Sequence, residues 1–357
     1  MRRSKPKLWE MLPKVPVVRK HLDEFYSFMY ERHMIWRRRF VKRLPPPWTK
    51  DPLLRDYKFT NVYRELDYGT LWYLSHVYPA LEVQRRPGLE LVWRTLIYRL
   101  VNRVQTFEKI PIISYQDWPR LHRLWLDSLR KLHKTESVFT SAHLTLPVGV
   151  GNSGISKVDK LGLVLKGAYK QFETLCRDLE RAKDLQTAFH ILRRIECVGP
   201  FISYEICCDL MNVKFLPFKE NDWVNPGPGC KTGIRLIFPT TKTDEGCRER
   251  IQELQRSQEP HFRRLGLSFP YLHRGELLTL RSIEHSLCEY AKYWKAKHGV
   301  GKARIIFKPR DWPNAQGQLP FRFPRAQHFL LQQGLLLVEE GCSNESIRGW
   351  GAWGHLF

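Results

Sequence analysis

Polar side chains interrupt an apolar segment, residues 59–70, at spacings that could build a reactive surface. If the segment is a helix, two sets of residues three or four positions apart occupy two sides of it: Asn61, Arg64 and Glu65, and Tyr63, Asp67 and Thr70. The apolar flanking residues indicate a buried helix, in which a guanidinium could bind phosphate and a carboxylate could accept a proton. A solvated helix face with an Arg–Asp ion pair would have the same spacing.

A second polar array lies in the helix predicted over residues 277–297, beside a stripe of apolar residues. Its members, at helical spacings of three and four, are Glu284, His285, Cys288, Glu289 and Lys292. Carboxylates beside a group that titrates near neutrality could perform general acid–base chemistry on an amine nucleophile. A ladder of surface ion pairs would have the same pattern. The spacing matches no common metal site, so we expect neither a metal nor a cofactor.

The sequence Pro226-Gly227-Pro228-Gly229, followed by KTGIRLIF, predicts a rigid turn that opens a helix. Amides at such a turn, together with nearby cations, could hold phosphate or pyrophosphate. The candidates for this binding are Gly227, Gly229, Lys231 and Arg235. A turn that needs glycine only for its backbone conformation would look the same.

A helix end, a tight turn at Val198-Gly199-Pro200 and a second helix follow one another within residues 192–210. This layout is typical of a helix-hairpin-helix element, whose turn amides and helix N-terminus can bind a DNA phosphate. Gly199 and Tyr204 are its binding candidates. A plain turn between two helices would look similar, and Cys197 replaces the first glycine of the usual hairpin.

DNA glycosylases that contain this element use a hairpin lysine for lyase chemistry and a downstream aspartate for base excision. In this sequence Phe201 stands near the place of the lysine, and Asp222 lies near the place of the aspartate. A Schiff-base lyase is therefore not expected, whereas Asp222 remains a candidate catalytic residue.

The chain contains Lys+Arg 59 against Asp+Glu 36, a formal net charge of +23. Such an excess predicts a polyanionic partner, and nucleic acid is the first candidate. The DNA-binding candidates lie in RHMIWRRRFVKR and are Arg37, Arg38, Arg39, Lys42 and Arg43. A basic surface at an anionic membrane, or one without a partner, would have the same composition.

The eight cysteines show no C-x-x-C spacing, so neither a zinc site nor a disulfide framework is expected. The sequence shows no apolar signal region and no membrane span, which predicts a protein that is not secreted, nuclear in a eukaryote and otherwise cytoplasmic. Residues 149–157 begin like a phosphate-binding kinase loop, but Ile155 stands where the essential lysine belongs.

Apolar periodicity is helical almost throughout, which predicts an all-α, two-lobed helical domain. The layout of residues 192–210 adds a helix-hairpin-helix element of the kind that DNA glycosylases contain. We expect a basic segment at 1–24, a first helical lobe at 25–150 and a second lobe with the hairpin at 151–310. Residues 311–357 are rich in Gly and Trp toward their end and are expected to form a partly disordered extension.

Four stretches in order carry a family resemblance: PPPWTKDPLLRDYKFTNVYRELDYGTLW, VGPFISYEICCDL, NPGPGCKTGIRLIF and IEHSLCEYAKYWK. They resemble the α-glutamyl/putrescinyl thymine pyrophosphorylases and the helical domain of 5-hydroxymethyluracil DNA kinases, over about residues 25–310. The resemblance implies an all-helical enzyme, distantly akin to the glycosylases, that acts on hypermodified thymine in DNA. In that chemistry a 5-hydroxymethyl group is activated as its pyrophosphate, which an amine or amino acid then displaces.

On this basis the residues expected to act in catalysis are Arg64, Glu65, Asp67, Asp222, Glu284, His285 and Glu289. The expected substrate- or phosphate-binding residues are Asn61, Gly199, Tyr204, Gly227, Gly229, Lys231, Arg235 and Lys292. We expect the polar residues of segment 59–70 to face those of helix 277–297 across a cleft floored by Gly227 and Gly229.

The expected partners are DNA with modified thymine and an amine or amino-acid co-substrate. Two other functions fit the same residues: a monofunctional glycosylase that uses Asp222, and a non-catalytic module that recognises modified DNA.

Overall fold

The computed structural model describes residues 16–77, 86–141, 145–146, 154–273 and 275–300. These residues are helical and contain no strand, which confirms the predicted all-α class for this part of the chain. The helices are α1 (Arg19–Trp36), α2 (Pro52–Asp56), α3 (Tyr68–Trp72), α4 (Pro87–Val101), α5 (Val104–Lys109), α6 (Trp118–Thr135), α7 (Lys157–Tyr169), α8 (Phe172–Glu180), α9 (Leu185–Leu192), α10 (Pro200–Asn212), α11 (Pro228–Ile237), α12 (Asp244–Arg256), α13 (Gln258–Arg264) and α14 (Leu280–Lys297).

Several helices begin where the sequence supplies a capping side chain. Asp184 accepts a hydrogen bond from the Thr187 N–H at the start of α9, and Thr279 accepts one from the Ser282 N–H at the start of α14. Such caps satisfy backbone donors that the first helical turn leaves unpaired. Asp184 and Thr279 thus mark the starts of α9 and α14.

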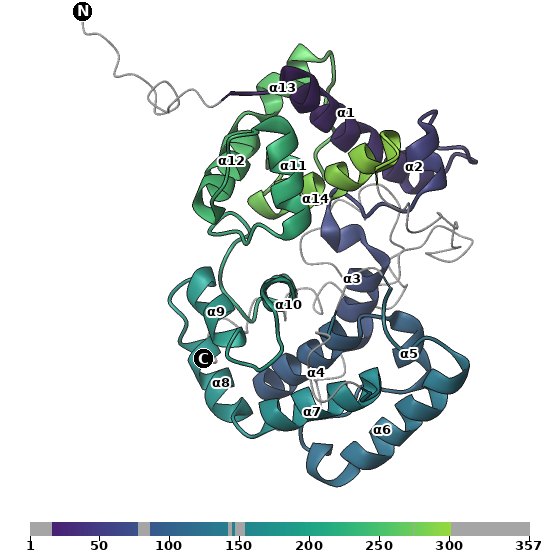
Figure 1. The fold of residues 1–357 in the computed structure, drawn as a ribbon, viewed down its shortest axis with the longest axis vertical. Coiled ribbons are helices and arrows are strands. Elements are labelled where there is room, and N and C mark those ends of the chain that lie inside the picture. Colours follow the sequence, from purple (N-terminus) through teal and green to yellow (C-terminus); the bar gives the residue numbers. More distant parts are fainter. Residues whose placement is uncertain (1–15, 78–85, 142–144, 147–153, 274, 301–357) are drawn as a thin grey trace, which may run out of the picture.

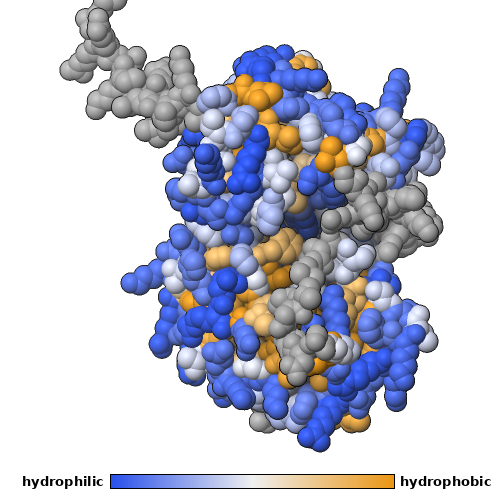
Figure 2. Space-filling model, in the orientation of Figure 1, coloured by the Kyte–Doolittle hydropathy of each residue, from blue (hydrophilic) through white to orange (hydrophobic). Residues whose placement is uncertain are grey.

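The described helices lie in two groups (Figure 1). The upper group contains α1, α2 and α11–α14, and the lower group contains α3–α10. Figure 2 shows hydrophilic residues over most of this face, with apolar patches near the middle of the lower group. Because α1 packs against α11, α13 and α14, the first and last parts of the described chain share one group.

The closest helix packing in the upper group joins α11 to α14. A Cβ atom added to Gly233 would lie 2.3 Å from the carbonyl oxygen of Leu287, and one added to Gly229 would lie 2.3 Å from Sγ of Cys288. Only glycine permits this approach. The contact fixes the start of α11 beside the polar face of α14.

The prediction of a continuous helix over residues 59–70 is wrong. The backbone is irregular up to Tyr63, forms a single 3-10 turn at Arg64–Leu66 and enters α3 only at Tyr68. The Asn61 side chain donates to the Leu66 carbonyl, and the Asn61 N–H donates to Oδ1 of Asp67. Because these side chains take backbone partners locally, they compete with a regular helix.

Some expectations concern residues outside the described part of the chain. The extension at 311–357 lies there, as does most of the basic segment at 1–24. The division into lobes at 25–150 and 151–310 stays a prediction. Within the described residues no helix has the length and hydropathy to cross a membrane, and the cysteines there form no disulfide.

Candidate active site

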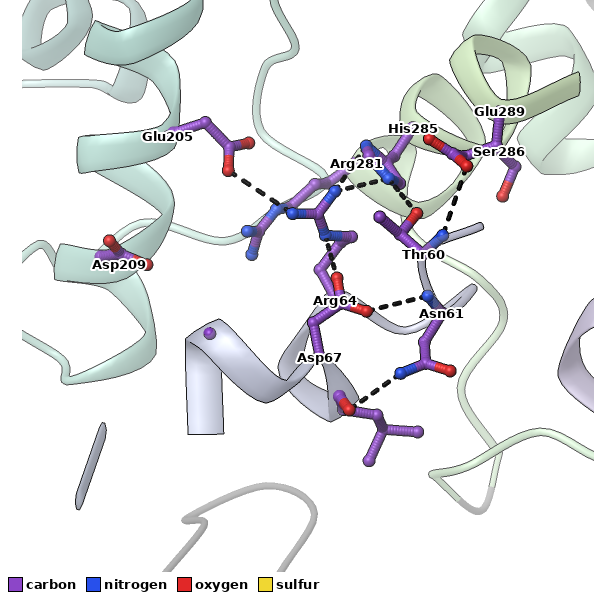
Figure 3. Close-up of polar contacts among 12 residues, drawn as sticks. Thr60, Asn61, Arg64, Asp67, Glu205, Asp209, Arg281, His285, Ser286 and Glu289 are labelled. Atoms are coloured by element: carbon purple, nitrogen blue, oxygen red, sulfur yellow. Dashed lines mark hydrogen bonds and ion pairs between the residues drawn. The ribbon is translucent and has the colours of Figure 1, made fainter. Parts of the chain in front are cut away.

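Arg64 lies at the centre of a polar cluster built from segment 60–67, α10 and α14 (Figure 3). Its Nη1 contacts the imidazole of His285, 2.9 Å from Nδ1 and 2.5 Å from Nε2. Its Nε lies 2.7 Å from Oδ2 of Asp67, and its Nη2 lies 3.8 Å from Oε2 of Glu205. The Arg64 side chain is only 14% exposed, so these charges interact with little screening by water.

Thr60 connects the same segment to α14. Its N–H donates to Oε2 of Glu289 at 3.3 Å, and its Oγ1 lies 2.5 Å from Nε2 of His285. Glu289 is buried and also forms an ion pair of 2.9 Å with Lys292, which is half exposed. The predicted meeting of the 59–70 segment with Glu289 and His285 is therefore present in the structure.

The surroundings of His285 indicate that its imidazole is neutral. Burial, followed by the charge of Arg64, holds the pKa of His285 well below its usual value, so the ring is neutral near pH 7. A guanidinium can only donate, and a neutral imidazole accepts at one nitrogen and donates at the other. Arg64 therefore donates to the ring nitrogen that carries no proton, and the Thr60 hydroxyl can donate to or accept from Nε2.

A buried ion network lies behind Arg64, between α4 and α10. Arg99 donates through Nε and Nη2 to the two oxygens of Asp209, each at 2.5 Å, and through Nη1 to Glu205 at 2.9 Å. Asp209 is fully buried, and its bidentate pair with Arg99 satisfies both oxygens. Because Glu205 contacts both Arg99 and Arg64, this network positions Arg64 from the side of the lower group.

Two further arginines are buried close to the cluster with nitrogens that lack hydrogen-bond partners among the described residues. Arg281 donates through Nη1 to Glu220 at 2.9 Å, whereas its Nε and Nη2 are unpaired. Arg32 donates through Nη2 to Ser286 Oγ at 2.8 Å, whereas its Nε and Nη1 are unpaired. They are 2% and 4% exposed, so water satisfies little of this donor capacity.

Glu284 occupies a separate position on the same face of α14, beside the start of α11. Its Oε1 accepts a hydrogen bond of 3.0 Å from the Gly227 N–H. Burial raises the pKa of the Glu284 carboxyl to about 7, although this hydrogen bond opposes the rise. The carboxyl can therefore gain or lose a proton near neutral pH. The Gly227 amide is already occupied, so the turn does not present it to a phosphate.

Several residues predicted for the site contact other groups. Glu65 faces His273 at 3.3 Å, Lys231 forms an ion pair of 2.6 Å with Asp244, and Arg235 donates to the carbonyls of Thr241 and Lys242. Lys231 and Arg235 thus point toward the start of α12, and their role in phosphate binding stays a prediction. The close packing of α11 on α14 explains why position 229 is a glycine.

The residues predicted from the hairpin region are dispersed. Asp222 is exposed, and its carboxylate accepts from the Lys219 N–H in the same turn. Tyr204 is buried in α10, where its hydroxyl lies 3.5 Å from the Trp223 carbonyl. Gly199 is the residue before α10, with open space around it.

The basic stretch after α1 is only partly exposed. It forms a π-helical turn, Arg37–Val41, in which Arg38 pairs with Glu31 at 2.6 Å and Arg39 lies over the rings of Phe40 and Trp48. Burial lowers the pKa of Arg37, which is not fully exposed. Lys42 and Arg43 are the exposed members of the stretch.

Sequence reasoning missed Arg32, Thr60, Arg99, Glu205, Asp209, Glu220, Arg281 and Ser286. A signal was present for some of them. Glu205 and Asp209 are four residues apart in an otherwise apolar helix, and Arg99 interrupts a similar one. Like Arg64, these residues are charged side chains in otherwise apolar segments. Within the described residues, no group of three or more His, Cys, Asp or Glu side chains is arranged to hold a metal ion.

The chain belongs to the family of the 5-hmdU DNA kinase helical domain, because the model of that domain matches residues 19–303. The predicted resemblance to this helical domain is thereby confirmed. A curated relative, the 5-hmdU DNA kinase of Bacillus phage SP10, is 29% identical over 291 residues, which cover 76% of this chain and 44% of the phage protein. The chain thus spans less than half of that relative. No solved structure matches it significantly.

Proposed function

We propose that this chain acts on 5-hydroxymethyl-pyrimidine bases in DNA and displaces pyrophosphate from the activated base with an amine or an amino acid. Membership of the 5-hmdU DNA kinase helical domain family supports the substrate, as does the net charge of +23.

The observation that carries the proposal is the pair of buried, incompletely bonded arginines beside Arg64. Buried donors without acceptors are costly, and Arg32 and Arg281 each retain two. An anion with several oxygens could satisfy these donors. A departing pyrophosphate is such an anion, and donors fixed before the reaction stabilise the charge that develops on it. The proposed cradle is thus Arg32, Arg64 and Arg281.

Carboxylates for the other reactant lie in the cluster, at Glu289, and beside it on the same face of α14, at Glu284. In the proposed step the amine nitrogen attacks the exocyclic methylene carbon, and the bond from that carbon to the pyrophosphate oxygen breaks with both electrons leaving on oxygen. The nitrogen then releases a proton to a carboxylate. Glu284 suits this role because its pKa of about 7 lets it accept and later release a proton. Glu289 would hold the incoming amine as its ammonium ion, which must first lose a proton to solvent before the neutral nitrogen can attack.

Duplex binding is assigned to two surfaces. One is the turn before α10, where Cys197 has a φ of 66° at the position of the first hairpin glycine. This left-handed conformation is the one that glycine supplies in such turns, so the backbone is compatible with a helix-hairpin-helix element. The other surface contains the exposed Lys42 and Arg43. We propose that the helix groups α1, α2, α11–α14 and α3–α10 act as two lobes with the Arg64 cluster between them, a division of the chain that differs from the predicted one at residue 150.

The other two functions remain outcomes of one test. A glycosylase would use Asp222, whose present partner is a backbone N–H of its own turn, and a non-catalytic module would bind modified DNA without changing it. The protein should be incubated with duplexes that contain 5-hydroxymethyluracil, its pyrophosphate or uracil, with and without amines. Nucleoside mass spectrometry then distinguishes the three functions: an amine adduct supports the proposal, whereas a released base or an unchanged duplex contradicts it.

A further inference from the structure

We propose that a pocket beside the Arg64 cluster receives a pyrimidine turned out of the DNA duplex. The pocket has a volume of about 440 Å³ and lies between α1, the π-helical turn 37–41 and the segments 46–49 and 57–61. This volume is within the range of about 300–1,000 Å³ that is typical of small-molecule sites. That the base is a modified pyrimidine rests on the proposed function.

The walls of the pocket are suited to a flat ring. Its aromatic lining residues are Trp36, Phe40, Trp48, Tyr57 and Phe59. The guanidinium carbon of Arg39 lies 4.7 Å from the ring centroid of Phe40 and 4.9 Å from that of Trp48. Aromatic and guanidinium planes side by side are what proteins use to stack unpaired bases.

The charge of the pocket selects against a free amine. Arg32, Arg39 and Arg55 line it, and no Asp or Glu is among its lining residues. Arg32 is 4% exposed and has two nitrogens without hydrogen-bond partners in the described part of the chain. These donors require acceptors, which the carbonyls and an anionic 5-substituent of a pyrimidine supply.

The pocket borders the cluster that we assign to the chemistry and shares wall residues with it. Thr60 lines the pocket and also contacts His285 and Glu289. Arg32 lines it and donates to Ser286 on α14. A base stacked on the aromatic walls could therefore direct its 5-substituent toward Arg64. Enzymes that modify a base in a duplex remove it from the stack, because its reactive atoms are otherwise inaccessible.

The test uses the full chain and a duplex in which 2-aminopurine lies next to a single thymine mispaired with guanine. Extrusion of the thymine unstacks its neighbour, so the fluorescence of 2-aminopurine increases. Trp48→Ala should remove most of this increase and weaken binding by about tenfold, because one stacked base is lost. Trp48→Phe should retain most of both. Trp294→Ala is the matched control, since Trp294 stacks on His298 away from the pocket.

A second pair of variants reverses the charge of an exposed residue, once on the pocket wall and once outside the pocket. Arg55→Glu places a carboxylate on the pocket wall and should reduce the fluorescence increase, whereas Arg19→Glu makes the same change in charge outside the pocket. Both side chains are more than half exposed, so neither change should unfold the chain.

Equal fluorescence and affinity for the wild type, Trp48→Ala and Arg55→Glu would contradict the proposal that this pocket receives an extruded base. Turnover of a pyrophosphorylated duplex that does not depend on Trp48 would also overturn it while leaving the proposed function intact. Trp48-dependent extrusion of thymine without any turnover of modified duplexes would support the pocket and contradict the proposed function.

Discussion

Arg64 and His285 are 221 residues apart in the sequence and lie in contact, with the guanidinium of one against the imidazole of the other. The contact joins the irregular segment before α3 to the middle of α14. It therefore depends on how the two helix groups come together, and the cluster around it contains the charges for both an anion and an amine.

The ion network behind Arg64 should be essential for stability. Asp209→Asn removes a carboxylate oxygen from the bidentate pair with Arg99 and leaves a buried guanidinium incompletely compensated. The free energy of unfolding should decrease by about 3–5 kcal/mol, the cost of breaking a buried pair from one side. Urea denaturation measures this change. Arg86→Gln, which removes an exposed pair with Glu173, is the control and should have an effect below about 1 kcal/mol. A similar midpoint for both variants would contradict the prediction.

The partners in this network could not be predicted from the sequence, whereas other features of the fold and the site could. Helix type and several helix starts follow from apolar periodicity and from caps such as Asp184, which are local features. The polar face of α14 and its meeting with Arg64 also followed from residue type and spacing. The buried partners Glu205 and Asp209 did not, because which arginine neutralises which carboxylate depends on long-range packing. The break in the helix at Asn61 was missed because a side chain took the place of backbone hydrogen bonds.

Glu284 should make stability depend on pH. Its pKa is raised from 4.5 to about 7, so between these values the folded state binds more protons than the unfolded state. The free energy of unfolding should therefore decrease as the pH rises from 4.5 to 7, by at most about 3 kcal/mol. Thermal unfolding of the wild type and of Glu284→Gln tests this, because the variant lacks the titrating group. The same slope in both proteins would assign the dependence to other groups.

The turn before α10 should anchor the duplex. A Cβ at Gly199 meets nothing within 4 Å, so Gly199→Asp should leave the fold intact while placing a carboxylate where a phosphate approaches. Duplex binding should weaken by about 1–3 kcal/mol, measured by fluorescence anisotropy. Gly199→Ala is the control for the added side chain alone. Unchanged affinity in the aspartate variant, with an unchanged circular-dichroism spectrum, would make the turn an ordinary helix connection.

Binding to DNA should depend strongly on salt, because the net charge is +23. If about six phosphates are engaged, the affinity should fall by about a thousandfold between roughly 50 and 200 mM salt. Lys42→Glu should weaken binding to all sequences alike. Arg38→Glu is a less suitable variant, because Arg38 pairs with Glu31 and would affect folding. An affinity that does not change with salt would contradict a phosphate-dominated interface.

The central claim is that Arg64 and Glu289 act on the modified base and do not serve duplex binding. The most direct measurement is single-turnover conversion of a duplex with one pyrophosphorylated 5-hydroxymethyluracil, followed by nucleoside mass spectrometry in the presence of an amine. Arg64→Ala and Glu289→Gln should abolish the adduct while duplex affinity remains close to that of the wild type. Arg64→Ala should also lower the melting temperature, because it leaves the buried carboxylate of Asp67 without its cation, so conversion is measured well below the melting temperature of each variant. Glu65→Gln is the matched control and should retain activity, because Glu65 faces His273. Full conversion by both Arg64→Ala and Glu289→Gln would contradict the account.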